Sequence, residues 1–199
     1  MTEANDVRRH FEETGALLTG HFKLSSGLHS DRYLQCARVL MWPARAGALG
    51  AALAARLAPF SPAAVVSPAM GGVIIGHEVG RALSVRAIFT ERVDGAFSLR
   101  RGFSLEAGER VAVVEDVVTT GKSTREVIEV ARGAGAVVAC CGSIIDRRAA
   151  GEKGDAVDGI PYRALLALDV PAWDAPACPL CARGEPLTAP GSRHLAASR

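Results

Sequence analysis

The sequence is poor in long apolar runs, in cysteine and in lysine, and each shortage excludes a class of protein. No segment approaches the roughly 20 apolar residues of a membrane helix, and the first ten residues lack the apolar core of a secretion signal. We therefore expect a cytoplasmic protein with no membrane partner. The five cysteines are odd in number and lack the spacing of a secreted disulfide scaffold, so Cys36, Cys140 and Cys141 are expected to be reduced core thiols.

A large excess of positive charge is also missing. The chain carries 23 basic and 21 acidic residues, for a formal net charge of +2, so we expect no nucleic-acid partner. Its lysines are Lys23, Lys122 and Lys153, and every other basic residue is arginine. Arginine grips phosphate well, although genome composition explains the bias equally. With 199 residues, 49% of them hydrophobic, the chain can form one main domain with attachments.

The stretch Arg110–Thr124 organises the rest of the chain. Val111–Val114 is a β-branched run typical of a strand covered on both faces. Two acids, Glu115 and Asp116, follow it. The pattern of Ser123 with Glu126 fits a capping box that begins a helix.

The loop between that strand and that helix has the composition of a phosphate cradle. Free N–H groups at the helix start, the hydroxyls of Thr119 and Thr120 and the small Gly121 suit an anion such as a sugar 5′-phosphate. The paired acids suit the vicinal hydroxyls of a ribose, because carboxylates only accept hydrogen bonds. The nucleotide-hydrolase loop is excluded, since Asp116 stands where that motif requires glycine. An ordinary strand–turn–helix is the structural alternative.

Two further segments favour anion binding. The loop Ser67–Gly72 joins a short strand, 62–66, to a helix over 73–83, which is weak evidence by itself. After a strand at 85–89, Thr90–Phe103 combines a hairpin turn at Asp94–Gly95 with three arginines, Arg92, Arg100 and Arg101. We interpret it as a mobile lid over a polyanion, or else as a solvated charged hairpin.

The long apolar strand 136–145 ends in Asp146-Arg147-Arg148. An arginine at this end of a strand can clamp a carboxylate, and we expect Arg148 to lie at the surface. Other expected elements are helices from about residue 5 to 15 and over 42–57, with Leu49, Leu53 and Leu57 on one side, and a strand at 161–168.

The pair Cys178 and Cys181 raises the question of a metal. One C-x-x-C supplies two ligands where zinc takes four, and His194 is the nearby third candidate. A structural turn with free thiols is the favoured interpretation, with a structural metal as the alternative.

These motifs resemble those of one enzyme family. The central stretch resembles the phosphoribosyl-diphosphate motif of type I phosphoribosyltransferases, and Phe-x-Leu-x-Ser-Gly from Phe22, followed by Ser-x-x-Tyr to Tyr33, resembles the N-terminal signature of orotate phosphoribosyltransferases. The resemblance implies an α/β fold with a mostly parallel twisted sheet flanked by helices. Residues 1–40 would form a helix and a small hood, 41–170 the core, and 171–199 an extension with the Cys178–Cys181 turn.

The resemblance also implies an activity. It is the Mg²⁺-dependent transfer of phosphoribosyl from 5-phospho-α-D-ribose 1-diphosphate (PRPP) to orotate, which yields orotidine 5′-monophosphate and pyrophosphate in de novo pyrimidine biosynthesis. Mg²⁺ would bind mainly through substrate oxygens, with Asp116 as the candidate protein ligand. A homodimer with a shared lid is implied. A purine phosphoribosyltransferase and a non-catalytic regulator that senses PRPP are the alternatives.

The residues that the resemblance assigns fall into three groups. The implied catalytic residues are Asp116, Arg92 and Arg100. The implied PRPP-binding residues are Glu115, Asp116, Val117, Val118, Thr119, Thr120, Gly121, Lys122, Ser123, Met70, Gly71 and Arg92. The implied orotate-binding residues are Thr119, Arg147, Tyr33 and Ser25. A cis peptide near Ala69–Met70 is implied as well. The chain departs from the family pattern in having Ser25, Met70 and Gly71 where relatives often have lysine, tyrosine and lysine, and in lacking lysine and histidine in the lid.

Overall fold

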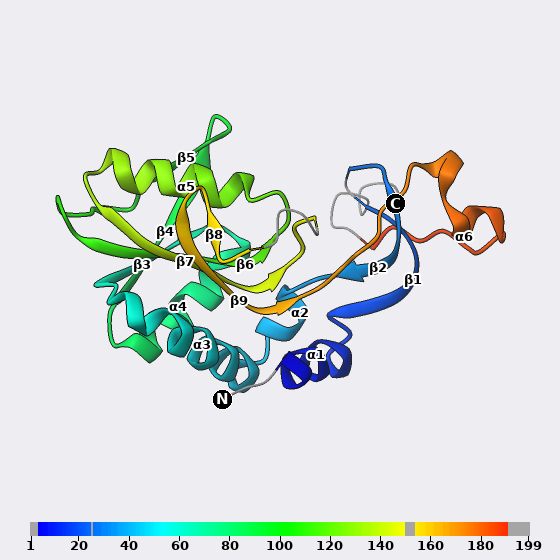
Figure 1. The fold of residues 1–199 in the computed structure, drawn as a ribbon, viewed down its shortest axis with the longest axis horizontal. Helices are drawn as coiled ribbons and strands as arrows, with labels where there is room; N and C mark the ends of the chain where they lie inside the picture. Colours follow the sequence, from blue (N-terminus) through cyan, green and yellow to red (C-terminus); the bar gives the residue numbers. More distant parts are fainter. Residues whose placement is uncertain (1–3, 25, 150–153, 191–199) are drawn as a thin grey trace.

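A computed structural model of the protein describes residues 4–24, 26–149 and 154–190. They form a seven-stranded sheet in the order β5-β4-β3-β6-β7-β9-β8 and a separate hairpin, β1-β2 (Figure 1). The helices are α1 Ala4–Glu13, α2 Ala37–Leu40, α3 Pro43–Leu57, α4 Gly71–Leu83, α5 Lys122–Gly133 and α6 Pro179–Ala182. The strands are β1 Leu17–Lys23, β2 His29–Leu34, β3 Ala64–Pro68, β4 Arg86–Val93, β5 Ala96–Leu99, β6 Arg110–Val118, β7 Val137–Asp146, β8 Ala156–Val157 and β9 Ile160–Ala167.

The five central strands of the large sheet are parallel, and antiparallel pairing is confined to the edge strands β5 and β8. This confirms the predicted α/β class. Connections through helices make the sheet parallel and cover both of its faces. The carboxyl ends of β3, β6 and β7 therefore lie at one edge, where the loops that follow them can meet.

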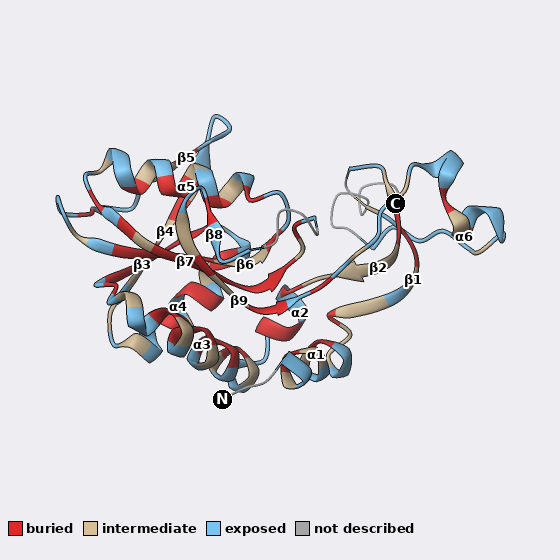
Figure 2. Ribbon diagram, in the orientation of Figure 1, coloured by how far each residue is buried: buried red, intermediate tan, exposed pale blue. Residues whose placement is uncertain are grey.

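Strand β6 is buried on both faces, as its β-branched run predicts (Figure 2). Ala112 and Val114 pack into one apolar cluster with α1, α3 and α4, whereas Val111 and Val113 pack into the other with α5. On the first side the predicted leucine stripe of α3 is fully buried: Leu49, Leu53 and Leu57 are each 0% exposed. The two cores hold the site loops on a rigid base.

Two predicted boundaries are wrong for physical reasons. The capping box is wrong, because α5 begins at Lys122 after Gly121 (φ 71°), and no side chain caps it. Glycine tolerates this left-handed conformation without strain. The strand predicted to end at Phe89 continues to Val93, because it pairs with β5 across the Asp94–Gly95 turn. The turn itself is confirmed, and the lid hairpin extends the sheet.

The N-terminal hairpin carries the hood signature and contacts the C-terminal extension. Its two antiparallel strands flank a turn in which Gly27 N donates to Leu24 O at 2.9 Å. Ser25 lies outside the described residues. Beyond β9 the chain leaves the large sheet, as predicted, and lies beside the hairpin, where Thr188 bridges to Phe22 and Trp173 bridges to His29 (Figure 1). The hood and the extension are thus joined.

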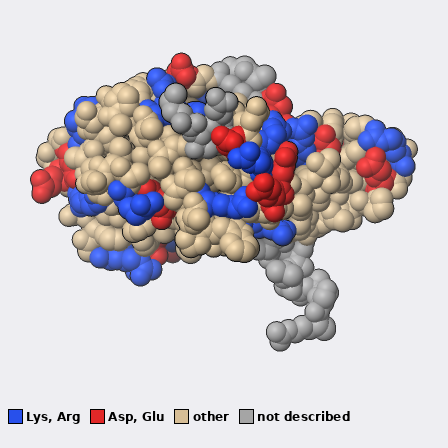
Figure 3. Space-filling view, turned by 90° about the horizontal axis from the view of Figure 1, so that it is seen from below, with Lys and Arg blue, Asp and Glu red and all other residues tan. Residues whose placement is uncertain are grey.

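Two further observations concern the distribution of charge on the surface and the length and polarity of the helices. On the face drawn in Figure 3, basic and acidic side chains lie interspersed among wider uncharged areas. Within the described ranges, every helix is too short or too polar to cross a lipid bilayer.

Candidate active site

The loop after β6 sits between two helix N-termini. Gly121 turns the chain so that Arg125 N donates to its carbonyl at 2.9 Å, the first bond of α5. The preceding Thr119 and Thr120 are exposed, and Lys122 N donates to Thr120 Oγ1 at 3.3 Å. Arg125, which the sequence did not single out, donates from Nη2 to Thr120 O at 2.7 Å and so links the loop to the first turn of α5. The loop therefore presents hydroxyls and helix-terminal N–H groups to an incoming anion.

Glu115 lies inside β6, in register with Ser143 of β7, rather than after the strand as predicted. The hydroxyl of Thr124 donates to Glu115 Oε2 at 2.8 Å. Burial raises the Glu115 pKa to about 7, and the Thr124 hydrogen bond opposes this rise. Thr124 was missed because its place in a helix start gave no sign that it would reach back to the strand.

Asp116 is the most constrained acid of the site. Its Oδ1 accepts from Val117 N at 2.8 Å, and burial raises its pKa above the ordinary value. The buried Cys36 thiol also interacts with this carboxyl and lowers its pKa slightly, whereas the pKa of the thiol itself is raised by burial and then by Asp116. Cys36 is thus the reduced, buried thiol expected, and it also interacts with a site acid.

The loop before α4 packs directly on Asp116. A Cβ on Gly71 would lie 2.8 Å from Asp116 Oδ1, so a larger residue there would require the Asp116 carboxylate to move. The Ala69–Met70 peptide is cis, which confirms the implied geometry, and the Met70 side chain is 84% exposed. The N-termini of α4 and α5 therefore converge beside Asp116, and backbone rather than side chains lines the α4 end.

Two of the three arginines of the lid hairpin form ion pairs with acids of the chain. Arg92 pairs with Glu126 of α5 at 2.6 Å, and its guanidinium carbon lies 4.0 Å from the centre of the Phe97 ring. Arg92 is also close enough to Glu115 to lower its pKa. Arg101 pairs with Glu91 at 2.8 Å, and Arg100 is exposed. Glu126, predicted to cap α5, instead anchors a lid arginine.

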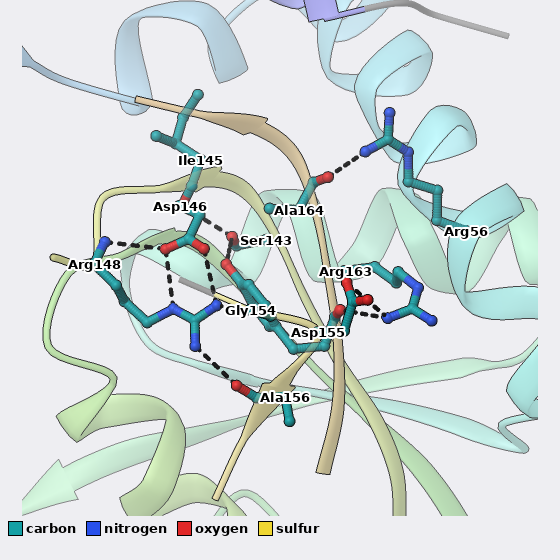
Figure 4. A network of polar contacts seen from close by, with 11 residues as sticks. Arg56, Ser143, Ile145, Asp146, Arg148, Gly154, Asp155, Ala156, Arg163 and Ala164 are labelled. Atoms are coloured by element: carbon teal, nitrogen blue, oxygen red, sulfur yellow. Dashed lines mark hydrogen bonds and ion pairs between the residues drawn. The ribbon is translucent and has the colours of Figure 1, made fainter. Parts of the chain in front are cut away.

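The two consecutive arginines after β7, Arg147 and Arg148, lie in different surroundings. Arg148, predicted to lie at the surface, is 6% exposed and grips Asp146 through two hydrogen bonds of 3.0 and 2.9 Å (Figure 4). Its guanidinium carbon also lies 4.4 Å from the centre of the Tyr162 ring. That expectation is therefore wrong, because a buried carboxylate lies within reach.

Arg147 lies next to the phosphate loop. Its backbone N–H donates to Val118 O at 2.8 Å, which ties it to the start of the loop. Its Nε is buried and has no hydrogen-bond partner within the described chain, and burial lowers the pKa of the guanidinium. A buried donor without a partner carries a desolvation cost that an arriving anion can offset. Arg147 therefore lies beside this loop with a buried donor that is unpaired within the described chain, and its role as a carboxylate clamp stays a prediction.

Comparison with known proteins agrees with this arrangement. No family model matches the sequence. The orotate phosphoribosyltransferase of Thermotoga maritima is 51% identical over 190 residues, covering 95% of this chain and 99% of the relative. That of Sphingopyxis alaskensis is 51% identical over 201 residues, covering 99% and 100%. The chain belongs to the orotate phosphoribosyltransferase family.

Solved structures place this orotate phosphoribosyltransferase family member among type I folds. The Aeropyrum pernix orotate phosphoribosyltransferase superposes with a TM-score of 0.65 at 27% identity, covering 81% of this chain and 93% of that one. The Trypanosoma brucei adenine phosphoribosyltransferase reaches 0.61 at 15% identity, which shows the fold alone. The fold is thus shared with an adenine phosphoribosyltransferase, and the fold by itself does not decide which base is used.

Other site residues implied by the resemblance are positioned as follows. The Val118 side chain is buried in the α5-side core, and the Val117 side chain packs at the edge of the other core. Only the backbone of these two residues is therefore left to face the loop. Lys122 is exposed and lies 3.9 Å from Glu126. Tyr33 lies in β2 opposite Leu18, with its ring centre 5.8 Å from that of Phe22. The hairpin, rather than the core, therefore carries Tyr33.

Proposed function

We propose that this chain catalyses the transfer of phosphoribosyl from PRPP to orotate, giving orotidine 5′-monophosphate and pyrophosphate in pyrimidine biosynthesis. Near-full-length similarity to orotate phosphoribosyltransferases supports the reaction. The observation that supports orotate in preference to a purine is the buried Nε of Arg147, which has no hydrogen-bond partner among the described residues. Orotate has a carboxylate that such a guanidinium can bind, and the purine bases lack one.

The phosphate loop and the two acids would hold the sugar. Thr119, Thr120 and the N–H groups at the start of α5 would bind the 5-phosphate. Glu115 and Asp116 would accept hydrogen bonds from the ribose hydroxyls, which requires their ionised forms. Positive charge develops on the ribose ring as the bond to pyrophosphate breaks, and the Asp116 carboxylate would stabilise that charge. Orotate N1 would then attack from the opposite face, which inverts the anomeric carbon.

A divalent cation fits the donor set. Asp116 and Glu115 offer carboxylate oxygens, which Mg²⁺ prefers, and Mg²⁺ commonly binds through one or two carboxylates together with substrate phosphates. Mg²⁺ would supply charge neutralisation for the leaving pyrophosphate. Each acid has one oxygen in a hydrogen bond, Glu115 Oε2 with Thr124 and Asp116 Oδ1 with Val117 N, so each has one oxygen left to offer, and Asp116 is the candidate that the family resemblance implies.

The lid would act on the leaving group. Arg92 and Arg100 would bind pyrophosphate after Arg92 exchanges Glu126 for the anion. Arginine stays protonated near neutral pH, so these residues would stabilise charge rather than donate protons. The edge position of the β4-β5 hairpin and the exposure of Arg100 support a homodimer in which the lid reaches the partner's site.

A product assay tests the proposal. The purified chain would be incubated with PRPP and orotate, hypoxanthine, xanthine or adenine, with and without Mg²⁺. We expect pyrophosphate release only with orotate and Mg²⁺, and its loss in Asp116→Asn. Turnover of a purine alone would replace the assignment by a purine enzyme, and tight PRPP binding without turnover of any base would replace it by a regulator.

A further inference from the structure

A cluster of four metal-ligating side chains lies away from the phosphate loop, between the hood hairpin and the C-terminal extension. His21 comes from β1, His29 from the start of β2, and Cys178 and Cys181 from the first turn of α6. One ligand atom from each lies within 4.8 Å of the others. The sequence offered only His194 as a nearby partner for the two cysteines and favoured a turn with free thiols. The hairpin supplies those partners, and His194 lies outside the described residues.

The contacts of His21 cannot all be ordinary hydrogen bonds. His21 Nδ1 lies 2.8 Å from Glu185 O, and a carbonyl only accepts, so Nδ1 carries the proton. In the neutral ring, Nε2 then has one lone pair. Three groups crowd that lone pair: His29 Nδ1 at 3.0 Å, Cys178 Sγ at 3.5 Å and Cys181 Sγ at 3.7 Å. A single lone pair cannot accept from all three.

A central cation removes this conflict. Zn–N bonds of about 2.0–2.1 Å and Zn–S bonds of about 2.3 Å, arranged tetrahedrally, place neighbouring ligand atoms roughly 3.3–3.8 Å apart. The contacts around His21 Nε2, and the 3.2 Å from Cys181 Sγ to His29 Nδ1, fall close to that range. The hydrogen bond to Glu185 O is the outer contact that typically orients a metal-binding histidine.

We propose that His21, His29, Cys178 and Cys181 bind one Zn²⁺ in a tetrahedral structural site. Two thiolates and two imidazoles are the donor set that selects zinc. Four protein ligands leave no open position for substrate, so the ion stabilises structure rather than taking part in catalysis. His21, His29 and Cys178 are 4%, 5% and 2% exposed, whereas Cys181 is exposed, so the ion would be buried on three sides and lie near the surface at Cys181.

The proposed zinc site explains how the short C-terminal extension keeps its conformation beside the β1-β2 hairpin. Helix α6 has only four residues, and Leu180 is its one buried residue. Main-chain bonds from Thr188 N to His21 O at 2.9 Å and from His29 N to Trp173 O at 2.8 Å join the two segments. Zinc would fasten the same two segments through side chains, and so fix the hood hairpin against the extension. Its binding energy would add directly to the stability of this region.

Metal content tests the proposal. The full-length chain, purified without a histidine tag or chelator, would be analysed by plasma mass spectrometry. We expect one zinc per chain, lost in Cys181→Ser and in His29→Asn but kept in the controls Cys140→Ser and His77→Asn. Circular dichroism would check that the variants fold. Zinc that persists in the ligand variants, or that disappears equally in the controls, would contradict the assignment.

Two further measurements hold even if the ligand variants fail to fold. Wild-type protein reconstituted with Co²⁺ should show the intense visible absorption of tetrahedral cobalt with thiolate ligands. Chelator treatment should lower Tm by roughly 5 °C or more, restored by Zn²⁺ and not by Mg²⁺. A metal-free protein that gains no stability from Zn²⁺, or a Cys178–Cys181 disulfide found by mass spectrometry in freshly purified protein, would overturn the proposal.

Discussion

Replacing Arg147 by alanine separates substrate recognition from stability. The guanidinium is expected to bind orotate's carboxylate through charge-assisted hydrogen bonds, which contribute about 1.5–3 kcal/mol, so KM for orotate should rise by about 10- to 150-fold. KM for PRPP should change little. Among the described residues of the free protein, Nε of Arg147 has no partner, so the substitution removes a buried donor that they leave uncompensated. Tm should therefore stay the same or increase.

Steady-state kinetics with each substrate varied in turn, together with thermal unfolding of the free protein, measure these effects. Arg147→Lys is the matched variant, since it keeps the charge and loses the planar fork, and it should recover only part of the orotate affinity. Equal rises in both KM values would refute the carboxylate clamp. A marked fall in Tm would show that Arg147 has a structural partner in the free protein.

Three other substitutions test the surrounding structure. Arg148→Ala should lower the free energy of unfolding by about 3–5 kcal/mol in denaturant titrations, because it leaves Asp146 buried without its ion pair; a loss under 1 kcal/mol, as for a surface arginine, would contradict this. Gly71→Ala should lower kcat/KM for PRPP while the protein stays folded, since the new Cβ would lie 2.8 Å from Asp116 Oδ1 and displace that carboxylate; an unchanged kcat/KM would show that the carboxylate position does not matter for turnover. Glu115 has a pKa of about 7 in the folded chain against an ordinary 4.5, so the folded state binds more protons between these values and its stability falls as pH rises through that window, by about 3 kcal/mol in full. The unfolding free energy of Glu115→Gln should lack this component, and parallel pH profiles for the two proteins would disprove it.

The sequence by itself determined the elements whose signals are local. The β-branched run of Val111–Val114 required a buried strand, and Asp94–Gly95 specified a tight hairpin turn. The order of threonines and Gly121 after two acids indicated a phosphate loop. The family resemblance then implied the cis peptide at Ala69–Met70, which local propensity alone does not indicate. These features depend on backbone preference and alternation of apolar residues over a few positions.

Only the tertiary structure decided which side chains meet across long stretches of sequence. Cys36 contacts Asp116, and Cys178 meets His21, more than 150 residues away, although neither cysteine differs locally from an inert thiol. Arg148 is buried because it pairs with Asp146 and donates to the carbonyl of Ala156 in β8. Arg147 takes no part in this ion pair. Such pairings depend on how strands and loops stack in space, and residue order along the chain does not encode them in any short pattern.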